Sequence, residues 1–269
     1  MSELQKRTVT GLFFVLILIF SIIGSEWTLS GVFYIFTIIG LGEFFTMFGK
    51  KSKRKPFSGV GLLLGTVVYW FLVINAMGQQ FENWWIWLIP ILVAAGLTAL
   101  FSKNEMPGID LGLTLLGVAF VSLPYALLSN ISLIEGYYNY EVVLGFFIML
   151  WTNDTGAYLV GRKLGRHKLF ERISPKKSWE GFFGGVAFCF IAAGVIAQFF
   201  ESLALSEWLI VAAIVSVFSN LGDLFESMLK RNCGVKDSGK IFPGHGGVLD
   251  RLDGLIFAIP MVYFYLMIK

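Results

Sequence analysis

Charged residues are scarce in this chain of 269 residues, and so are cysteines. Asp, Glu, Lys and Arg make up 14% of the sequence, whereas soluble domains usually carry about 25%. Hydrophobic residues reach 56% and include 27 Phe and 8 Trp, which excludes a soluble globular domain and indicates an integral membrane protein. Cys189 and Cys233 are too few for a disulfide framework or a cysteine metal cluster.

Long apolar segments recur along the whole chain. Nine of them come close to the roughly 20 residues that a helix needs to cross a bilayer. They predict an all-α, polytopic integral membrane protein with about nine transmembrane helices. The last segment is the least regular, because it is short and contains Gly254 and Pro260. The expected spans are 8–24, 29–49, 58–77, 84–101, 109–128, 141–160, 181–200, 206–229 and 254–268.

Positive charge is distributed unevenly over the loops between these spans. If the N-terminus lies in the cytoplasm, all but one of the 21 Lys and Arg residues fall on the cytoplasmic side, and only Lys269 falls on the other. Cytoplasmic loops of membrane proteins carry such an excess. We therefore expect a protein integral to the cell (inner) membrane, with its N-terminus and its basic loops in the cytoplasm.

Loop character also divides the chain in two. Residues 1–135 are expected to form N-terminal transmembrane helices joined mostly by short connectors. Residues 136–269 are expected to form a C-terminal catalytic transmembrane region with two basic cytoplasmic loops. No internal repeat is evident, so an inverted-repeat transporter gains no support from the sequence.

Polar residues interrupt several spans in the half of the bilayer nearer the cytoplasm. Asn153 and Asp154 interrupt the sixth span, and Glu43 lies near the end of the second. In the eighth span, at about 100° per residue, one helix face is polar within roughly 60° of Asp223. Because ionisable residues are costly inside a membrane and often functional, these side chains predict a cavity open to the cytosol. Glu43 also has a simpler interpretation as helix-end polarity satisfied by snorkelling or pairing. The polar face of the eighth span consists of Asn220, Asp223, Glu226, Ser227 and Lys230.

A glycine-rich loop follows this polar face. Accessible backbone N–H groups combined with Lys and Arg suit phosphate oxygens. The loop matches neither GxxxxGK[ST] nor GxGxxG. The glycines are Gly234, Gly239, Gly244, Gly246 and Gly247, and the interleaved or following basic residues are Lys236, Lys240, His245 and Arg251.

Two acids close the loop, and their role has two interpretations. Asp250 and Asp253 are three residues apart, so both can face one way if the last helix starts there. They can complement the dipole of a helix N-terminus, or they can supply a ligand for a divalent metal. Mg²⁺ sites commonly use one or two carboxylates together with substrate phosphates and water. Asp223 and Asp250, on different helices, could share such an ion.

A third basic block precedes the seventh span. Ser174-Pro175 is a turn or helix-start signal, and Lys176 and Lys177 follow it directly. These lysines can contact anionic lipid headgroups and set topology, or they can capture the phosphates of a substrate.

Together these motifs resemble a known signature. The segment Ser227-x-x-Lys230-Arg231-x4-Lys236-Asp237-x-Gly239-x3-Pro243-Gly244-His245-Gly246-Gly247-x2-Asp250-Arg251-x-Asp253 is similar to that of the CDP-diacylglycerol synthase, or phosphatidate cytidylyltransferase, family. The upstream segments Asp154-x-x-Ala157-Tyr158-x-x-Gly161 and Ile173-Ser174-Pro175-Lys176-Lys177-Ser178-x-Glu180-Gly181 also resemble it. The similarity covers residues 150–254 well, and the N-terminal half resembles the family only in its hydrophobicity.

The resemblance implies an enzyme, a nucleotidyltransferase that transfers CMP from CTP to phosphatidic acid and forms CDP-diacylglycerol and pyrophosphate. It implies Mg²⁺ at Asp223 and Asp250, a nearby potassium ion and a homodimer, with the lipid bilayer as surroundings and no nucleic acid as partner. The expected catalytic residues are Asp223, Asp250, Lys230, Arg231, Lys236, Asp237, Arg251 and Asp253. The expected substrate-binding residues are Asn153, Asp154, Lys176, Lys177, Ser178, Glu226, Ser227, His245, Gly246 and Gly247.

Two alternatives stay open at this point. Another membrane lipid phosphotransferase could use similar chemistry, although the sequence lacks the DxxDGxxAR…GxxxDxxxD pattern of enzymes that consume a CDP-alcohol. An anion transporter could also carry intramembrane acids and a basic vestibule. However, a transport path must continue to the other face of the membrane, and the outer halves of the spans contain few charged residues.

Overall fold

The computed structural model describes residues 3–51, 54–78, 86, 88–242 and 246–269. Within these ranges most residues are helical, and the named strands form one two-stranded hairpin. Seven helical segments are long and apolar enough to cross a membrane, and the shorter apolar helices Thr8–Gly24 and Leu88–Leu100 accompany them. The structure confirms the predicted all-α, polytopic membrane fold.

The helices overlap the predicted spans, with ends that differ by a few residues, and residues 84, 85 and 87 of the fourth predicted span lie outside the described residues. The fifth span, Pro107–Ile131, combines α5, η2 and α6, and α10 begins at Leu249, earlier than the expected residue 254. In the N-terminal part the elements are α1 (Glu3–Gly24), α2 (Glu26–Lys51), α3 (Ser58–Ala76), α4 (Leu88–Leu100), α5 (Pro107–Gly117), the π-helical η2 (Val118–Ser122) and α6 (Leu123–Ile131). In the C-terminal part they are α7 (Glu141–Leu164), β1 (Lys168–Phe170), β2 (Ser174–Ser178), α8 (Trp179–Ile196), α9 (Leu205–Asn232) and α10 (Leu249–Ile268).

A proline accounts for the irregular centre of the fifth span. Pro124 lies at the start of α6, directly after the π-helical turn of η2. Proline lacks the backbone N–H that would bond four residues back, and its ring collides with that carbonyl group. The wider turn of a π-helix relieves this collision without ending the span.

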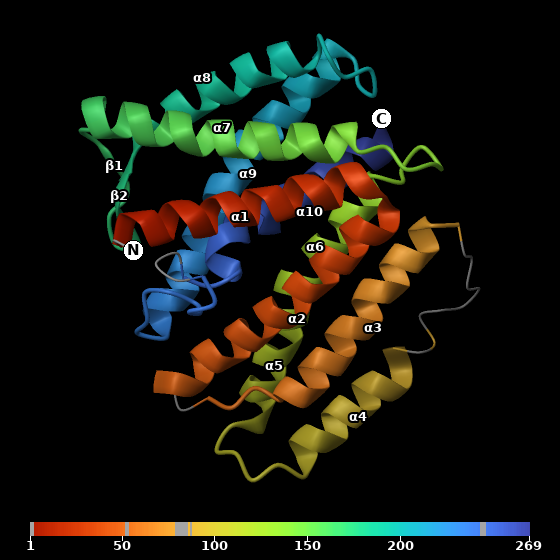
Figure 1. The fold of residues 1–269 in the computed structure, drawn as a ribbon. Coiled ribbons are helices and arrows are strands. Elements are labelled where there is room, and N and C mark those ends of the chain that lie inside the picture. Colours follow the sequence, from red (N-terminus) through yellow and green to blue (C-terminus); the bar gives the residue numbers. More distant parts are fainter. Residues whose placement is uncertain (1–2, 52–53, 79–85, 87, 243–245) are drawn as a thin grey trace.

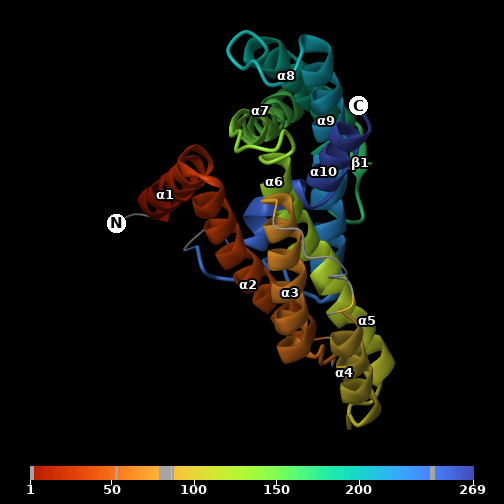
Figure 2. The ribbon, with the colours of Figure 1, turned by 90° about the vertical axis from the view of Figure 1, so that its right-hand side faces the viewer.

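The C-terminal elements form two helix pairs that cross each other. Figure 1 shows α7 and α8 side by side across the upper part of the molecule, with α9 and α10 running behind and below them. Figure 2 shows α7 nearly end-on, whereas α9 and α10 run lengthwise. The antiparallel hairpin β1–β2 connects α7 to α8. Ser174-Pro175 therefore begins a strand, and α8 starts later, where the Ser178 hydroxyl caps it by accepting the N–H of Gly181.

Glycines allow α7 and α8 to pack closely. A Cβ atom at Gly184 would lie 2.5 Å from Cβ and Cγ2 of Val160, and one at Gly156 would lie 2.7 Å from Cβ of Phe188. Small residues permit such close backbone approach in membrane helices. This packing holds the end of β2, with its lysines, near the polar residues of α7.

Replacing Gly184 by Ala is expected to destabilise the protein by about 1–3 kcal/mol, because the stiff Val160 side chain cannot move away from the added methyl group. The measurement is the thermal midpoint of the detergent-solubilised protein. Gly194→Ala on the same helix is the matched control, since nothing lies within 4 Å of its Cβ position. An unchanged midpoint in Gly184→Ala would contradict the packing of α7 against α8.

Candidate active site

A cavity of about 590 Å³ opens where α7, β2, α8, α9 and α10 meet. Its volume falls within the range of about 300–1,000 Å³ that is typical of ligand sites. Charged side chains of both signs line it, so it suits a strongly polar ligand. The charged lining residues are Asp154, Arg162, Lys176, Lys177, Asp223, Asp250, Arg251 and Asp253.

A lysine from the hairpin reaches into this cavity and pairs with α9. The Nζ atom of Lys177 lies 2.7 Å from Oδ2 of Asp223 and donates to Oδ1 of Asn220 at 3.2 Å. The hydroxyl of Ser227 donates to the other oxygen of Asp223 at 3.2 Å. These contacts join three of the predicted site residues on two separate elements.

A second lysine is buried between α9 and α10. The Nζ atom of Lys230 lies 2.7 Å from Oε2 of Glu226, one helical turn earlier, and 2.7 Å from Oδ1 of Asp250. At most 9% of any of these three side chains is exposed. A charge this deeply buried needs a partner of opposite sign, so Lys230 ties the two acids, and with them the two helices, together.

Asp250 is held from several directions at once. Its Oδ2 atom accepts the N–H and hydroxyl of Ser238, both at 2.9 Å, and the N–H of Gly247 at 2.8 Å. Its Oδ1 atom accepts from Lys230. Both carboxylate oxygens are therefore engaged by protein donors, although the residue also lines the cavity.

Three acids lie close together beside the ion pair of Lys230 and Asp250. Single carboxylate oxygens of Asp223, Glu226 and Asp253 all lie within 4.8 Å of one another. Gly222 lets α9 approach α10 here, because a Cβ atom would lie 2.6 Å from the carbonyl oxygen of Asp253. Between Asp250 and Asp253, the backbone of Leu252 departs from helical geometry. Asp250 and Asp253 therefore make different contacts.

This acidic group fits a divalent cation. Glu226 is 1% exposed, and its Oε1 atom has no hydrogen-bond partner among the described residues. An unpartnered carboxylate oxygen at that depth is costly. Oxygen ligands from carboxylates are those that Mg²⁺ prefers. The group Asp223, Glu226 and Asp253 can therefore hold such an ion.

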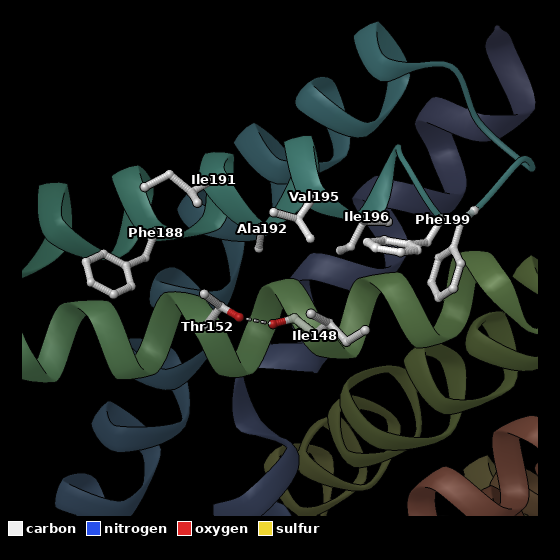
Figure 3. A pocket seen from close by; sticks show the side chains of 9 residues that line it. Ile148, Thr152, Phe188, Ile191, Ala192, Val195, Ile196 and Phe199 are labelled. Atoms are coloured by element: carbon white, nitrogen blue, oxygen red, sulfur yellow. Dashed lines mark hydrogen bonds between the residues drawn. The ribbon is translucent and has the colours of Figure 1, made fainter.

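A second cavity between α7 and α8 has a different character. Figure 3 shows its apolar side chains projecting between the two helices, and its volume is about 430 Å³. Thr152 lines this cavity and Asp154 lines the polar one. Residues two positions apart in a helix point about 200° away from each other around its axis. The two cavities therefore open on opposite sides of α7. The apolar cavity is thus separate from the charged site.

Comparison with known proteins agrees with this geometry. Residues 5–269 match the model of the cytidylyltransferase family. A phosphatidate cytidylyltransferase of Staphylococcus epidermidis is 34% identical, covering 96% of this chain and 97% of that protein. One from Bacillus subtilis is 32% identical, covering 99% of this chain and 98% of that protein.

The chain belongs to the cytidylyltransferase family. This confirms the family that the sequence resembles, and with it an enzyme of the nucleotidyltransferase class. The relationship extends over nearly the whole chain, including the N-terminal half, for which the sequence analysis recognised a resemblance in hydrophobicity alone.

Most of the predicted site residues fall into three groups according to their position relative to the charged cavity. The first group lines it and comprises Asp154, Lys176, Lys177, Ser178, Asp223, Asp250, Arg251 and Asp253. The second group contacts this lining or its neighbouring elements from behind and comprises Asn153, Glu226, Ser227, Lys230 and Gly247. Arg231, Lys236 and Asp237 are exposed and outside the described lining. Gly246 turns the loop at a positive φ of 86°. His245 lies outside the described residues.

Two contributors were missed as site residues by the sequence analysis. Asn220 was placed on the polar face of the eighth span without a role, and it accepts from Lys177. Ser238 lies between Asp250 and Glu43 of α2: its Oγ atom is 2.9 Å from Oδ2 of Asp250 and 3.2 Å from Oε2 of Glu43, and its single proton is shared between the two carboxylates. A serine in a glycine-rich loop carries no signal of its own in the sequence, whereas the helical spacing of Asn220 from Asp223 could have identified it.

Replacing Lys230 by Met is expected to destabilise the protein by about 3–5 kcal/mol, because Glu226 and Asp250 would be left as buried, unpaired acids. Thermal or denaturant unfolding in detergent measures the loss. Lys269→Met is the matched control: its pair with Glu207 has side chains 33% and 27% exposed, and such pairs contribute about 0–1 kcal/mol. Equal losses in the two variants would contradict the central position of Lys230.

Proposed function

We propose that this chain transfers CMP from CTP to phosphatidic acid and thereby forms CDP-diacylglycerol and pyrophosphate. The observation that carries the proposal is a cavity, among apolar membrane-spanning helices, in which cationic side chains adjoin a cluster of acids. Family membership and curated relatives named phosphatidate cytidylyltransferase support the same substrates.

The cavity suits a reaction between two polyanions of different solubility. Phosphatidic acid is anchored in the bilayer, whereas CTP arrives from water. A charged cavity among long apolar helices can bind both substrates. The helices that form it are apolar enough to lie in the bilayer, and the side chains that line it are largely polar or charged. Lys176, Lys177 and Arg251 supply positive charge for their phosphate groups.

The chemical step needs positioning more than a strong base. A phosphate oxygen of phosphatidic acid attacks the α-phosphorus of CTP and forms a new P–O bond. The bond from the α-phosphorus to the bridging oxygen breaks, and pyrophosphate leaves with the electron pair. Because a phosphate monoester is already a nucleophilic anion, the side chains chiefly hold the reactants in line and neutralise charge.

We infer that the acidic group holds Mg²⁺. These carboxylates would hold the ion beside the cavity, where it would supply charge neutralisation for phosphate oxygens and for the departing pyrophosphate. The sequence analysis expected Asp223 and Asp250 as ligands. The geometry favours Asp223 with Glu226 and Asp253, because single carboxylate oxygens of these three residues lie within 4.8 Å of one another. Asp250 accepts from four donors of the protein, whereas Asp223 contacts two, Lys177 and Ser227. In this arrangement Asp250 orients Lys230 beside the site.

The remaining expectations concern surroundings and assembly. We place the cavity at the cytoplasmic side of the inner membrane, because the basic loops flank it and cytoplasmic loops carry such charge. A homodimer and a nearby K⁺ are expectations that the family resemblance adds. The alternatives, another lipid phosphotransferase or an anion transporter, are not favoured by the family match.

The purified wild-type protein in detergent is expected to convert labelled CTP and phosphatidic acid to CDP-diacylglycerol and pyrophosphate, and activity should require Mg²⁺. Thin-layer separation of the labelled lipid measures the product. A CDP-alcohol supplied in place of CTP should give no lipid product. Anion uptake by proteoliposomes without any lipid product would overturn the proposal in favour of a transporter.

Three carboxamide variants distinguish the metal ligands from Asp250. Asp223→Asn is expected to lower turnover by about 10²-fold or more, as for loss of one charge-stabilising group. Asp223→Asn and Asp253→Asn should also raise the Mg²⁺ concentration needed for half-maximal activity. Asp250→Asn should lower turnover comparably and leave that concentration nearly unchanged. A raised Mg²⁺ requirement in Asp250→Asn alone would restore Asp250 as the ligand.

A further inference from the structure

An acid from the N-terminal half of the chain contacts the glycine-rich loop between α9 and α10 from outside the cavity. Glu43 on α2 is 7% exposed. Its Oε1 atom accepts the N–H of Val248 at 3.1 Å, and its Oε2 atom accepts the N–H of Leu249 at 3.0 Å. These donors are at the N-terminus of α10, where a helix leaves N–H groups unpaired. A carboxylate there is favoured by the helix dipole as well.

The same carboxylate is joined to the charged site by one hydroxyl group. Ser238 Oγ lies 3.2 Å from Oε2 of Glu43 and 2.9 Å from Oδ2 of Asp250. Glu43, Ser238 and Asp250 therefore form a continuous polar chain from α2 to Lys230. Asp250 lines the cavity, whereas Glu43 is not among its lining residues.

Glycines fit the loop tightly around Glu43. A Cβ atom at Gly239 or at Gly247 would overlap the carboxylate oxygens of Glu43. At these two positions the loop backbone can approach the acid because it carries no side chain. Two glycines of the signature, far apart in sequence from α2, have a physical role in this contact.

We propose that Glu43 is a positioning residue of the transferase: it fixes the glycine loop and the first turn of α10, so that Asp250 and Lys230 keep their places beside the cavity. This inference rests on the proposed function. Displacement of the reacting groups by about 1 Å can cost about 10²-fold in rate, so loss of this support should reduce turnover even in folded enzyme.

The test compares Glu43→Gln with a matched acid elsewhere. Glu141 on α7 makes the same kind of contact, accepting the N–H groups of Glu201 and Ser202 and the Ser202 hydroxyl, in a loop far from α10 in the chain. Glu141→Gln therefore removes the charge from another acid that accepts loop N–H groups, away from the site. All contacts of Glu141 are to its Oε2 atom, whereas Glu43 accepts through both oxygens. Gly239→Ala disturbs the Glu43 contact independently, and Gly42→Ala is its control because nothing lies within 4 Å of that Cβ position.

Below the unfolding temperature, Glu43→Gln and Gly239→Ala are expected to lower kcat by about 10-fold or more, as supporting residues around a site commonly do. The KM values for CTP and phosphatidic acid should change by less than about threefold. Glu141→Gln and Gly42→Ala should keep the kcat of wild type. Equal kcat values in Glu43→Gln and Glu141→Gln would overturn the positioning role.

Hydrogen exchange separates this outcome from failure of the proposed function. Mass spectrometry of the intact protein in detergent should show faster exchange at residues 246–250 in Glu43→Gln and unchanged exchange there in Glu141→Gln. If the wild type forms no CDP-diacylglycerol, the proposed function fails and this measurement still decides whether Glu43 holds the loop. Unchanged exchange in Glu43→Gln would overturn the contact itself.

Discussion

Compensation of the buried charge on Lys230 is the constraint on which the site depends. One ammonium group faces two carboxylates, those of Glu226 and Asp250, so the group carries more negative than positive charge. Asp250 also accepts hydrogen bonds from the N–H and hydroxyl of Ser238 and from the N–H of Gly247, which stabilise its negative charge. Glu226 keeps an unpartnered oxygen, and Asp223 and Asp253 lie beside it. The excess of acid is therefore located at the group for which we propose a divalent cation.

Close helix crossings make this arrangement possible. Gly222 brings α9 against the carbonyl group of Asp253, and Gly156 and Gly184 bring α7 against α8. Without side chains at these points, the backbones approach and the long polar side chains nearby can meet. The hairpin between α7 and α8 then delivers Lys177 to Asp223. The glycines that allow close helix packing thus also bring the polar side chains of the cavity near one another.

The spans and the polar face of α9 could be predicted because each depends on local periodicity, a run of apolar residues or a spacing of three and four. Contacts between distant segments could not. Glu43 and Leu249 are separated by most of the chain, and no local pattern links them. The hairpin was missed since Ser174-Pro175 also suits a turn or a helix start. Asp250 was expected as a metal ligand or as an acid at a helix N-terminus. Its hydrogen bonds depend on a serine and a glycine whose positions only the folded loop determines.

The two lysines of the site differ in how firmly they are held, and this difference follows from burial. Lys177 and Asp223 have side chains 24% and 32% exposed, so water can replace either partner and their separation costs little. Lys230 is 9% exposed and its acids are less exposed still, so its separation would leave charges in a medium that solvates them poorly. If the cavity binds a polyanion, as we propose, that ligand competes with Asp223 for Lys177 and leaves the carboxylate to a cation, while Lys230 keeps its two acids on α9 and α10. The buried contacts of Lys230 keep the cavity in shape, whereas the exposed pair of Lys177 and Asp223 can separate when a ligand binds.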